Sequence, residues 1–240
     1  MAEKKYAAIV LSAGKGTRMN SDVPKQYLML EGKPVLYYAL LAFEKSMVKE
    51  IILVTGKDDI AYCKEEIVER YGFTKVKAVT AGGKERYHSV FCGLAELNQR
   101  QYPPDYVMIH DGARPFVDDG IIERCREAVE TYEACVAGMP VKDTIKIVDE
   151  HLFAAETPDR KNVWQMQTPQ VFSFPLIYQS YHELIKRENS GEVFRVTDDA
   201  MVLETICGKS ARMVEGSYEN IKITTPEDLE IAAAILGRKM

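Results

Sequence analysis

The residues best suited to chemistry lie in a glycine-rich loop near the start of the chain. The segment Leu11-Ser12-Ala13-Gly14-Lys15-Gly16-Thr17-Arg18 follows a short apolar run, and its glycines let backbone N–H groups turn toward an anion. Basic side chains follow at Lys15, Arg18 and Lys25. These residue types predict a loop that binds a nucleoside triphosphate. The alternative is an ordinary strand-to-helix turn with solvated basic residues, and the loop alone does not separate the two.

Two common phosphate-binding motifs do not fit this loop. A Walker A loop needs four residues between its first glycine and the Gly-Lys pair, and that spacing is absent. A dinucleotide-binding fingerprint needs a third glycine, and Met19 stands in its place. The loop therefore disfavours both an ATPase of the Walker type and a hydride-transfer enzyme.

Seven further polar motifs occur in order along the chain. They are Gly82-Gly83-x-Glu85-Arg86-x-x-Ser89, His110-Asp111-Gly112-Ala113-Arg114-Pro115, Pro140-Val141-x-Asp143-Thr144, Asp159-Arg160, Gln167-Thr168-Pro169-Gln170, Thr197-Asp198-Asp199-Ala200 and Asn220-Ile221-Lys222-Ile223-Thr224. With the first loop and Pro24-Lys25-Gln26-Tyr27-Leu28, they make the chain from Ala7 to about Leu236 resemble the 2-C-methyl-D-erythritol 4-phosphate cytidylyltransferases. This family of sugar-phosphate nucleotidyltransferases serves the non-mevalonate isoprenoid pathway. Each motif alone is weak evidence, whereas the ordered series is specific.

The resemblance implies transfer of CMP from CTP to 2-C-methyl-D-erythritol 4-phosphate, which releases pyrophosphate and forms 4-diphosphocytidyl-2-C-methyl-D-erythritol. Such a transfer needs an attacking phosphate oxygen in line with the α-phosphorus, and positive charge on the crowded anions. The resemblance assigns the catalytic roles to Arg18, Lys25, Arg160 and Lys222. Mg²⁺ is the expected cofactor and would be carried mainly by the CTP phosphates. Asp111 could contact that metal or the substrate hydroxyls, or it could be a turn residue.

The same resemblance supplies two sets of binding residues. The nucleotide-binding set is Ser12, Ala13, Gly14, Gly16, Gly82, Gly83, Ser89, Asp111 and Gly112. Within it, the resemblance implies that the Gly82-Gly83 turn, with Ser89, reads the cytosine through backbone groups. The acceptor-binding set is Asp111, Arg114, Asp143, Thr144, Arg160, Thr168, Thr197 and Lys222. Arg86 would be a wall of the base pocket or part of a structural ion pair. Without its flanking motif, Lys222 would be interpreted as a solvated strand lysine.

The elements that must position these residues alternate between strands and helices. Buried strands are predicted at Tyr6 to Leu11, Glu50 to Thr55, Val76 to Thr80 and Tyr106 to His110. Helices are predicted at Pro34 to Lys45, Ile60 to Tyr71, Glu85 to Asn98, Asp118 to Tyr132, Leu176 to Glu188, Thr197 to Ile206 and Pro226 to Leu236. This alternation predicts an α/β, Rossmann-like three-layer fold in one domain spanning 1–240. Ligands of such folds bind at the carboxyl edge of the mostly parallel sheet.

The pattern changes after Pro140. Residues 141–153 alternate in polarity, which predicts a hairpin with its turn at Asp149-Glu150, and an extended stretch follows from Trp164 to Phe172. A lone hairpin has little core of its own. By resemblance, the extended β-arm at about 141–165 embraces a second subunit, so that the partners are CTP, a polyol phosphate and a second copy of the chain. Arg160 would then reach the partner's active site.

Bulk properties exclude several function classes. The net charge of −5 argues against a nucleic-acid binder. The N-terminus lacks the apolar length of a signal peptide or membrane span, so no membrane partner is expected. The five cysteines are scattered and are expected to be reduced thiols of a cytoplasmic protein. The four histidines have no zinc-binding spacing.

Two alternatives remain open. A ribitol-5-phosphate cytidylyltransferase would share the loop, the acidic strand end and the arm, although Thr157-Pro158-Asp159-Arg160 and Trp164 favour the methylerythritol enzymes. A non-catalytic nucleotide sensor could use the same fold. The joint presence of Arg18, Lys25 and Lys222 argues against a sensor, since a sensor would need no aligned acceptor site.

Overall fold

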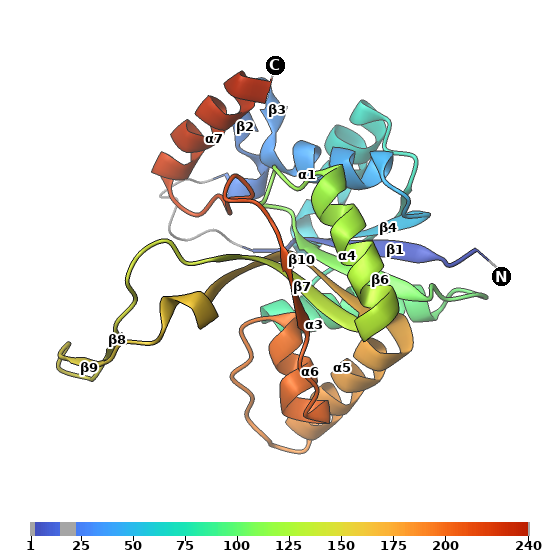
Figure 1. The fold of residues 1–240 in the computed structure, drawn as a ribbon. Coiled ribbons are helices and arrows are strands. Elements are labelled where there is room, and N and C mark those ends of the chain that lie inside the picture. Colours follow the sequence, from blue (N-terminus) through green and yellow to red (C-terminus); the bar gives the residue numbers. More distant parts are fainter. Residues whose placement is uncertain (1–2, 15–22, 240) are drawn as a thin grey trace.

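The short β-branched runs form one central sheet in the computed structural model, which describes residues 3–14 and 23–239 (Figure 1). Its strands are β1 (Tyr6–Ser12), β4 (Glu50–Thr55), β5 (Val76–Ala81), β6 (Tyr106–Asp111), β7 (Ala134–Pro140), β10 (Trp164–Ser173) and β11 (Arg212–Glu215). Their spatial order is β11-β7-β10-β6-β1-β4-β5. Only β10 runs antiparallel to its neighbours in this sheet. The prediction of a mostly parallel sheet is confirmed.

Helices cover both faces of the sheet and make it the middle of three layers (Figure 1). One face carries α1 (Val35–Lys45), α2 (Ile60–Tyr62) with its π-helical continuation Cys63–Glu69, and α4 (Asp119–Tyr132). The other face carries α3 (Arg86–Asn98), α5 (Phe174–Asn189) and α6 (Asp199–Cys207). Side chains of β1 alternate between the two layers, with Ala8 and Val10 on the first face and Ala7 and Ile9 on the second. The two faces form separate buried clusters.

A third buried cluster lies at the carboxyl edge of the sheet. It joins the hairpin β2 (Met29–Leu30) and β3 (Lys33–Pro34) to α7 (Pro226–Lys239), through Leu30, Ile223 and Ile235 among others. The Asp228 carboxylate accepts hydrogen bonds from the backbone N–H groups of Thr224 and Thr225, which fixes the start of α7. This packing brings the C-terminal segment back to the loop that follows β6, where the N–H of Ile223 donates to the carbonyl of Ala113.

The chain reverses its order across the sheet between β1 and β6. From β1 it passes to β4 and β5 on one side, and it then crosses to β6 on the other side of β1. Leu11 and Asp111 are register partners at the carboxyl ends of these two strands. A reversal of this kind opens a crevice where open α/β sheets bind ligands.

The arm leaves the body after β7 and returns at β10 (Figure 1). Its two short strands are β8 (Ile147–Val148) and β9 (Ala154–Glu156), which pair antiparallel. The expected hairpin at 141–153 is therefore wrong in its bounds. The Asp149 carboxylate accepts from the N–H groups of His151 and Phe153, so that a longer loop replaces a tight turn. Trp164 already pairs with Pro140 in the central sheet, and the arm ends before it.

Two strands of the sheet lie outside the predicted set. β7 contains small residues and Gly138, where a Cβ would come within 2.8 Å of the Gln165 carbonyl. β11 is short and partly exposed, so its sequence has no clear alternation. The segment Ile60 to Tyr71 is helical as predicted but contains the π-helical stretch. Within residues 3–14 and 23–239, no helix combines the length and apolar character needed to cross a membrane.

Candidate active site

Two cavities meet at the carboxyl edge of β1 and β6. The larger measures about 480 Å³ and is lined by the segment Leu11–Gly14, by Lys25 and by the turn Gly83–Arg86. The smaller measures about 250 Å³ and is lined by Arg114, Thr168 and Thr197 among others. Among the residues that the structure describes, three line both cavities, namely Arg86, Asp111 and Lys222. We call these three residues the junction. Two ligands bound in the two cavities would therefore share it.

Asp111 lies between the two basic residues of the junction. Its Oδ2 accepts from Lys222 Nζ at 2.7 Å, and its Oδ1 lies 3.4 Å from Arg86 Nε. Burial alone would raise the pKa of the Asp111 carboxyl, but Arg86 and Lys222 outweigh burial and lower that pKa. Asp111 is therefore ionised at neutral pH. It holds both cations at the place where the cavities meet.

Arg86 is fixed from behind by a second carboxylate. Its Nη1 and Nη2 donate to the two oxygens of Asp199 at 2.8 Å each, which is the bidentate geometry that guanidinium and carboxylate groups favour. Burial opposes the charge on Arg86, but Asp199 and Asp111 outweigh it and raise the pKa of Arg86. The Tyr181 hydroxyl donates to Asp199 at 2.6 Å, and Gln170 Oε1 accepts from the Asp199 N–H at 2.9 Å. Arg86 thus both lines the cavities and forms a structural ion pair.

Substituting Tyr181 by phenylalanine tests how this buried pair is held. The side chain is fully buried, and its hydroxyl donates to an ionised carboxylate, so Tyr181→Phe is expected to lower the free energy of unfolding by about 1.5–3 kcal/mol. Tyr178→Phe on the same helix is the matched control, because Tyr178 contributes its ring to stacking with Phe174. Urea unfolding of both variants measures the difference. Equal stability of the two variants would contradict this role of the Tyr181 hydroxyl.

A buried histidine supports the backbone of Asp111. His110 Nε2 lies 3.1 Å from the carbonyl of Arg114, so this nitrogen carries the proton. His110 Nδ1 then accepts from Thr168 Oγ1 at 2.9 Å, and Thr168 Oγ1 accepts from the Asp111 N–H at 3.1 Å. Burial lowers the pKa of His110 to about 4. The neutral imidazole therefore fixes Thr168 against the end of β6.

The low pKa of His110 predicts a loss of stability in mild acid. Between pH 6.5 and 4 the unfolded chain binds a proton that the folded chain excludes, so the free energy of unfolding falls as pH falls, by about 3 kcal/mol at pH 4. The ordinary pKa of Asp111 lies below this window. Urea unfolding at several pH values is expected to show a flatter profile for His110→Gln than for the exposed control His182→Gln. Parallel stability profiles for the two variants would contradict the low pKa of His110.

A short, anchored turn presents Lys25 to the larger cavity. The turn is a 3-10 helix over Lys25–Tyr27. The buried Gln26 donates through Nε2 to the carbonyl of Ser12 at 2.6 Å, which ties the turn to the first loop. The Tyr27 hydroxyl lies 2.7 Å from Thr55 Oγ1, which ties it to β4. Two buried anchors thus hold the backbone on which Lys25 sits.

The turn before α3 forms the opposite wall of the larger cavity. The N–H of Gly83 donates to Ser89 Oγ at 3.1 Å. A Cβ at Gly82 would lie 2.6 Å from Ser89 Oγ and 2.7 Å from Ala13 Cβ, so only glycine lets this turn lie against the first loop. A Cβ at Gly112 would lie 2.9 Å from the Leu11 carbonyl, between β1 and β6. Packing therefore explains both glycines, and neither lines the cavities.

The structure brings together most of the residues predicted for the site. Those that line the larger cavity are Ser12, Ala13, Gly14, Lys25, Gly83, Ser89, Asp111 and Lys222. Those that line the smaller cavity are Asp111, Arg114, Thr168, Thr197 and Lys222. Gly16 and Arg18 lie outside the described residues. Asp143, Thr144 and Arg160 lie on the arm and line neither cavity, and Arg160 Nη1 donates to the carbonyl of Lys142 at 2.9 Å.

Seven residues that hold the site were given no role from the sequence. They are Gln26, Tyr27, His110, Gln170, Tyr181, Asp199 and Asn220. All of these except Tyr181 stand inside the quoted motifs, so membership of a motif was the available signal. Tyr181 stands in an amphipathic helix, where its pattern indicates only a core position.

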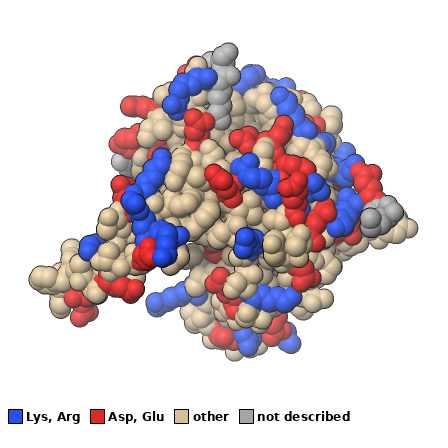
Figure 2. Space-filling view, viewed as in Figure 1, with Lys and Arg blue, Asp and Glu red and all other residues tan. Residues whose placement is uncertain are grey.

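The charges of the site suit anionic ligands with a bound cation. Within the described part of the chain, no group of three or more His, Cys, Asp or Glu residues is placed to hold a metal ion. Asp111 offers one carboxylate at the junction, which fits a cation that arrives on phosphate oxygens better than a site built by protein alone. Figure 2 shows Lys and Arg side chains in a band that runs from below α7 to the root of the arm.

The chain is similar to known proteins over almost its whole length. A family model described as 2-C-methyl-D-erythritol 4-phosphate cytidylyltransferase matches residues 6–238. A protein of that name from Lachnospira eligens is 50% identical over 230 residues, or 95% of this chain and 98% of the relative. One from Lachnoclostridium phytofermentans is 47% identical and covers 97% of each chain. The crystal structure of 4-diphosphocytidyl-2C-methyl-D-erythritol synthase from Anaerococcus prevotii is similar with a TM-score of 0.83 at 34% identity, covering 98% of this chain and 97% of that one.

Proposed function

The chain belongs to the 2-C-methyl-D-erythritol 4-phosphate cytidylyltransferase family, and from this premise we propose that its two cavities bind CTP and the acceptor side by side. The enzyme transfers CMP from CTP to 2-C-methyl-D-erythritol 4-phosphate and releases pyrophosphate. One observation carries our placement of the reaction, namely that Arg86, Asp111 and Lys222 line both cavities. CTP occupies the larger cavity, and the acceptor occupies the smaller one.

The proposed step is an in-line displacement at the α-phosphorus of CTP. An oxygen of the acceptor phosphate forms a new P–O bond, and the bond to the bridging oxygen of the β-phosphate breaks, so that the electron pair leaves on pyrophosphate. Two anionic substrates repel each other, and fixed cations lower that cost without reorganising during the reaction. Lys25 approaches from the wall beside the first loop, and Lys222 approaches from the acceptor side. Arg18, which lies outside the described residues, completes the proposed set of cations.

The cytosine end of CTP lies against the turn Gly83–Glu85 in this proposal. Gly83 carries no side chain, so the base can approach the backbone of the turn closely, and Ser89 Oγ is hydrogen-bonded to the N–H of Gly83 and the carbonyl of Glu85. Backbone groups held by a helix start can read the edge of a base at fixed distances. Ser12, Ala13 and Gly14, on the other wall, lie beside the sugar and the phosphates.

A divalent metal ion is typical of nucleotidyltransferases of this family, and we propose Mg²⁺. The residues fit an ion that binds with the triphosphate, because Asp111 offers a single carboxylate whose oxygens also face Lys222 and Arg86. When bound, Mg²⁺ would neutralise charge on the phosphates. Asp111 itself holds the two cations of the junction in place whether or not it touches the metal.

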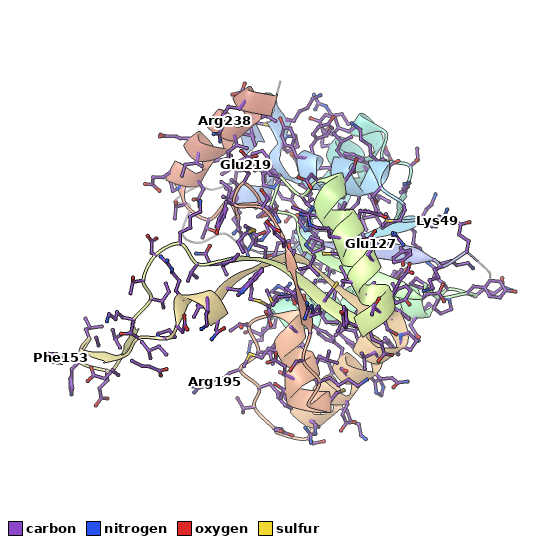
Figure 3. All side chains as sticks on the ribbon, viewed as in Figure 1. Lys49, Glu127, Phe153, Arg195, Glu219 and Arg238 are labelled. Atoms are coloured by element: carbon purple, nitrogen blue, oxygen red, sulfur yellow. The ribbon has the colours of Figure 1, made fainter. Side chains whose placement is uncertain are left out.

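We also propose that two chains pair through the arm. The arm exposes large apolar side chains, among them Leu152 at 81% and Phe153 at 72%, and Phe153 lies at its far end (Figure 3). A two-stranded hairpin of this length is at most marginally stable alone, and a second subunit would bury those side chains. Asp143, Thr144 and Arg160 would then complete the acceptor site of the partner. The five cysteines carry free thiols, which supports our proposal that the enzyme works in a reducing compartment such as the cytoplasm.

Pyrophosphate release tests the proposed acceptor. The protein with CTP and Mg²⁺ is expected to release pyrophosphate only when 2-C-methyl-D-erythritol 4-phosphate is present, and to stop when the metal is chelated. Faster release with ribitol 5-phosphate would favour the ribitol enzyme. Binding of CTP by calorimetry without release with either acceptor would favour a nucleotide sensor.

A further inference from the structure

A histidine and a glutamate outside both cavities are connected to the turn that faces the nucleotide. His88 lies in the first turn of α3, and Glu188 lies in the last turn of α5, 100 residues along the chain. His88 Nε2 lies 2.8 Å from Glu188 Oε2, and the Tyr87 hydroxyl donates to Glu188 Oε1. Neither His88 nor Glu188 lines the larger or the smaller cavity.

His88 is connected to the turn by a reciprocal pair of hydrogen bonds. The Glu85 side chain accepts from the backbone N–H of His88, and His88 Nδ1 accepts from the backbone N–H of Glu85 at 3.2 Å. This arrangement is a capping box, in which histidine stands where Glu or Gln is usual. A Cβ at Gly83 would lie 2.3 Å from His88 Cβ, so the turn also packs directly on this residue. Any shift of His88 therefore moves Gly83 and Glu85.

The hydrogen-bond roles of His88 agree with each other. Because Nδ1 accepts a backbone proton, the neutral ring carries its own proton on Nε2 and donates it to Glu188. Glu188 accepts from Tyr87 as well, and the hydrogen bond from Tyr87 lowers the pKa of the Glu188 carboxyl. Helix α5 is held to the sheet by the buried side chains of Ile177, Tyr181 and Leu184. A rigid helix thus supplies a fixed acceptor for the ring.

Glu188 stands in a place that local helix energetics do not favour. The carboxyl end of a helix carries partial negative charge, and a glutamate there is repelled by it. The two hydrogen bonds from α3 offset that cost. The contact therefore serves the link between α5 and α3 rather than the stability of α5 alone.

We infer that His88 and Glu188 form a brace that positions the turn Gly83–Glu85 and thereby sets the affinity for CTP without affecting the acceptor. The inference rests on the proposed function, because it takes the ligand of the larger cavity to be CTP. His88 and Glu188 are positioning residues, since they act on the nucleotide through the turn. The acceptor cavity is held by a different set of bonds, which run through Thr168, Asn220 and Arg114.

Steady-state kinetics and calorimetry with CTP and Mg²⁺ test the brace in the full-length protein. His88→Ala and Glu188→Ala are each expected to raise the KM and the Kd for CTP about five- to tenfold, the size expected for losing one or two hydrogen bonds at a partly exposed site. The KM for the acceptor and kcat stay within about twofold of the wild type. The double variant is expected to have a Kd for CTP no higher than that of the single variant that binds CTP less tightly, because both substitutions break the same connection.

Conservative variants separate positioning from a general loss of structure. His88→Gln restores an acceptor for the Glu85 N–H and a donor toward Glu188, so its CTP affinity is expected to lie within about twofold of the wild type. Glu188→Gln, which keeps the side-chain shape, is expected to fold and to lie between wild type and Glu188→Ala. Glu183→Ala, on the same helix in surface pairs with Lys186 and Arg187, is the matched control.

Three results would overturn the brace. These are equal rises in both KM values, a fall in kcat with unchanged CTP affinity, and a His88→Gln variant no better than His88→Ala. Calorimetry measures CTP binding without turnover, so it tests the brace separately from the proposed function. A wild type that binds CTP without transferring CMP would refute the proposed function alone, and variants with wild-type CTP affinity would refute the brace alone. A wild type that binds no CTP would refute both.

Discussion

Lys222→Ala will lower kcat/KM for the transfer of CMP by about 10²–10³, with little effect on the fold. Lys222 lines both cavities, and its Nζ lies 2.7 Å from Asp111 Oδ2. Its removal takes away a cation from the junction, where we propose that the two anionic substrates meet. It also leaves the negative charge of Asp111 close to those substrates, with Arg86 as the one remaining basic residue of the junction. Both effects act on the transition state, so kcat is expected to fall together with kcat/KM.

A surface lysine provides the control for this loss. Lys209→Ala removes an exposed ion pair with Glu133 and is expected to behave like the wild type in activity and in thermal unfolding. Steady-state assays with CTP and the acceptor, together with melting curves, measure both variants. A Lys222→Ala enzyme within fivefold of wild-type kcat/KM would show that the junction does not carry the chemistry.

Arg160→Ala is the second large effect, although Arg160 lines neither cavity of its own chain. If the partner's arm completes each acceptor site, Arg160→Ala will lower turnover about 100-fold while the protein stays folded and dimeric. Within its own chain, the Arg160 side chain is exposed and donates to the Lys142 carbonyl, so its loss removes little stability. Lys161→Ala, the next residue on the same short helix, is the matched control.

Mixed dimers show whether the site is shared. In a dimer of one Arg160→Ala chain and one Lys222→Ala chain, one site has both basic residues and the other has neither. Equal mixing with full exchange gives half mixed dimers, and therefore about a quarter of wild-type activity per chain. The absence of any recovery, with exchange confirmed by tagged chains, would show that Arg160 acts within its own chain or not at all.

The predicted fold was most accurate where local pattern alone determines structure. β1, β4 and β6 are buried on both faces, so their continuous apolar runs mark them within a residue of their ends. β5 was also placed within a residue of its ends, but it is an edge strand and only partly buried, so the prediction that it is buried was wrong. β7 and β11 were not predicted, because small residues and short length leave no periodic signal. In the arm, the alternation of 141–146 does not form a strand, since no neighbouring strand lies beside that segment to pair with it.

The candidate site was predictable as a set of residue types but not as an arrangement. Asp111 and Lys222 are 111 residues apart, and Arg86 and Asp199 are 113 apart, so no local pattern shows that they touch. The sheet reversal and the return of α7 bring these four side chains together. The hydrogen bond from Tyr181 to Asp199 could not be predicted either, because a buried tyrosine on an amphipathic helix has the sequence pattern of any core residue.

The Arg86–Asp199 ion pair and the His88–Glu188 contact are expected to affect the binding of the two substrates differently. The Asp199 pair fixes Arg86 at the junction, where we propose that both substrates meet. The proposed His88–Glu188 brace is connected to the turn Gly83–Glu85, which lines the larger cavity alone. Changes to the first are therefore expected to affect both substrates, and changes to the second to affect CTP alone.

The crystal structure of the protein with a CTP analogue that cannot be cleaved at the α,β-bridge, Mg²⁺ and the acceptor tests the central claim most directly. We predict the base against the turn Gly83–Glu85, the α-phosphate beside Lys25, and the acceptor phosphate in the smaller cavity within hydrogen-bond distance of Lys222. The attacking oxygen should lie in line with the α-phosphorus, and the partner's arm should close the acceptor site. An acceptor bound away from the junction, or a nucleotide whose phosphates point away from Lys222, would contradict the account.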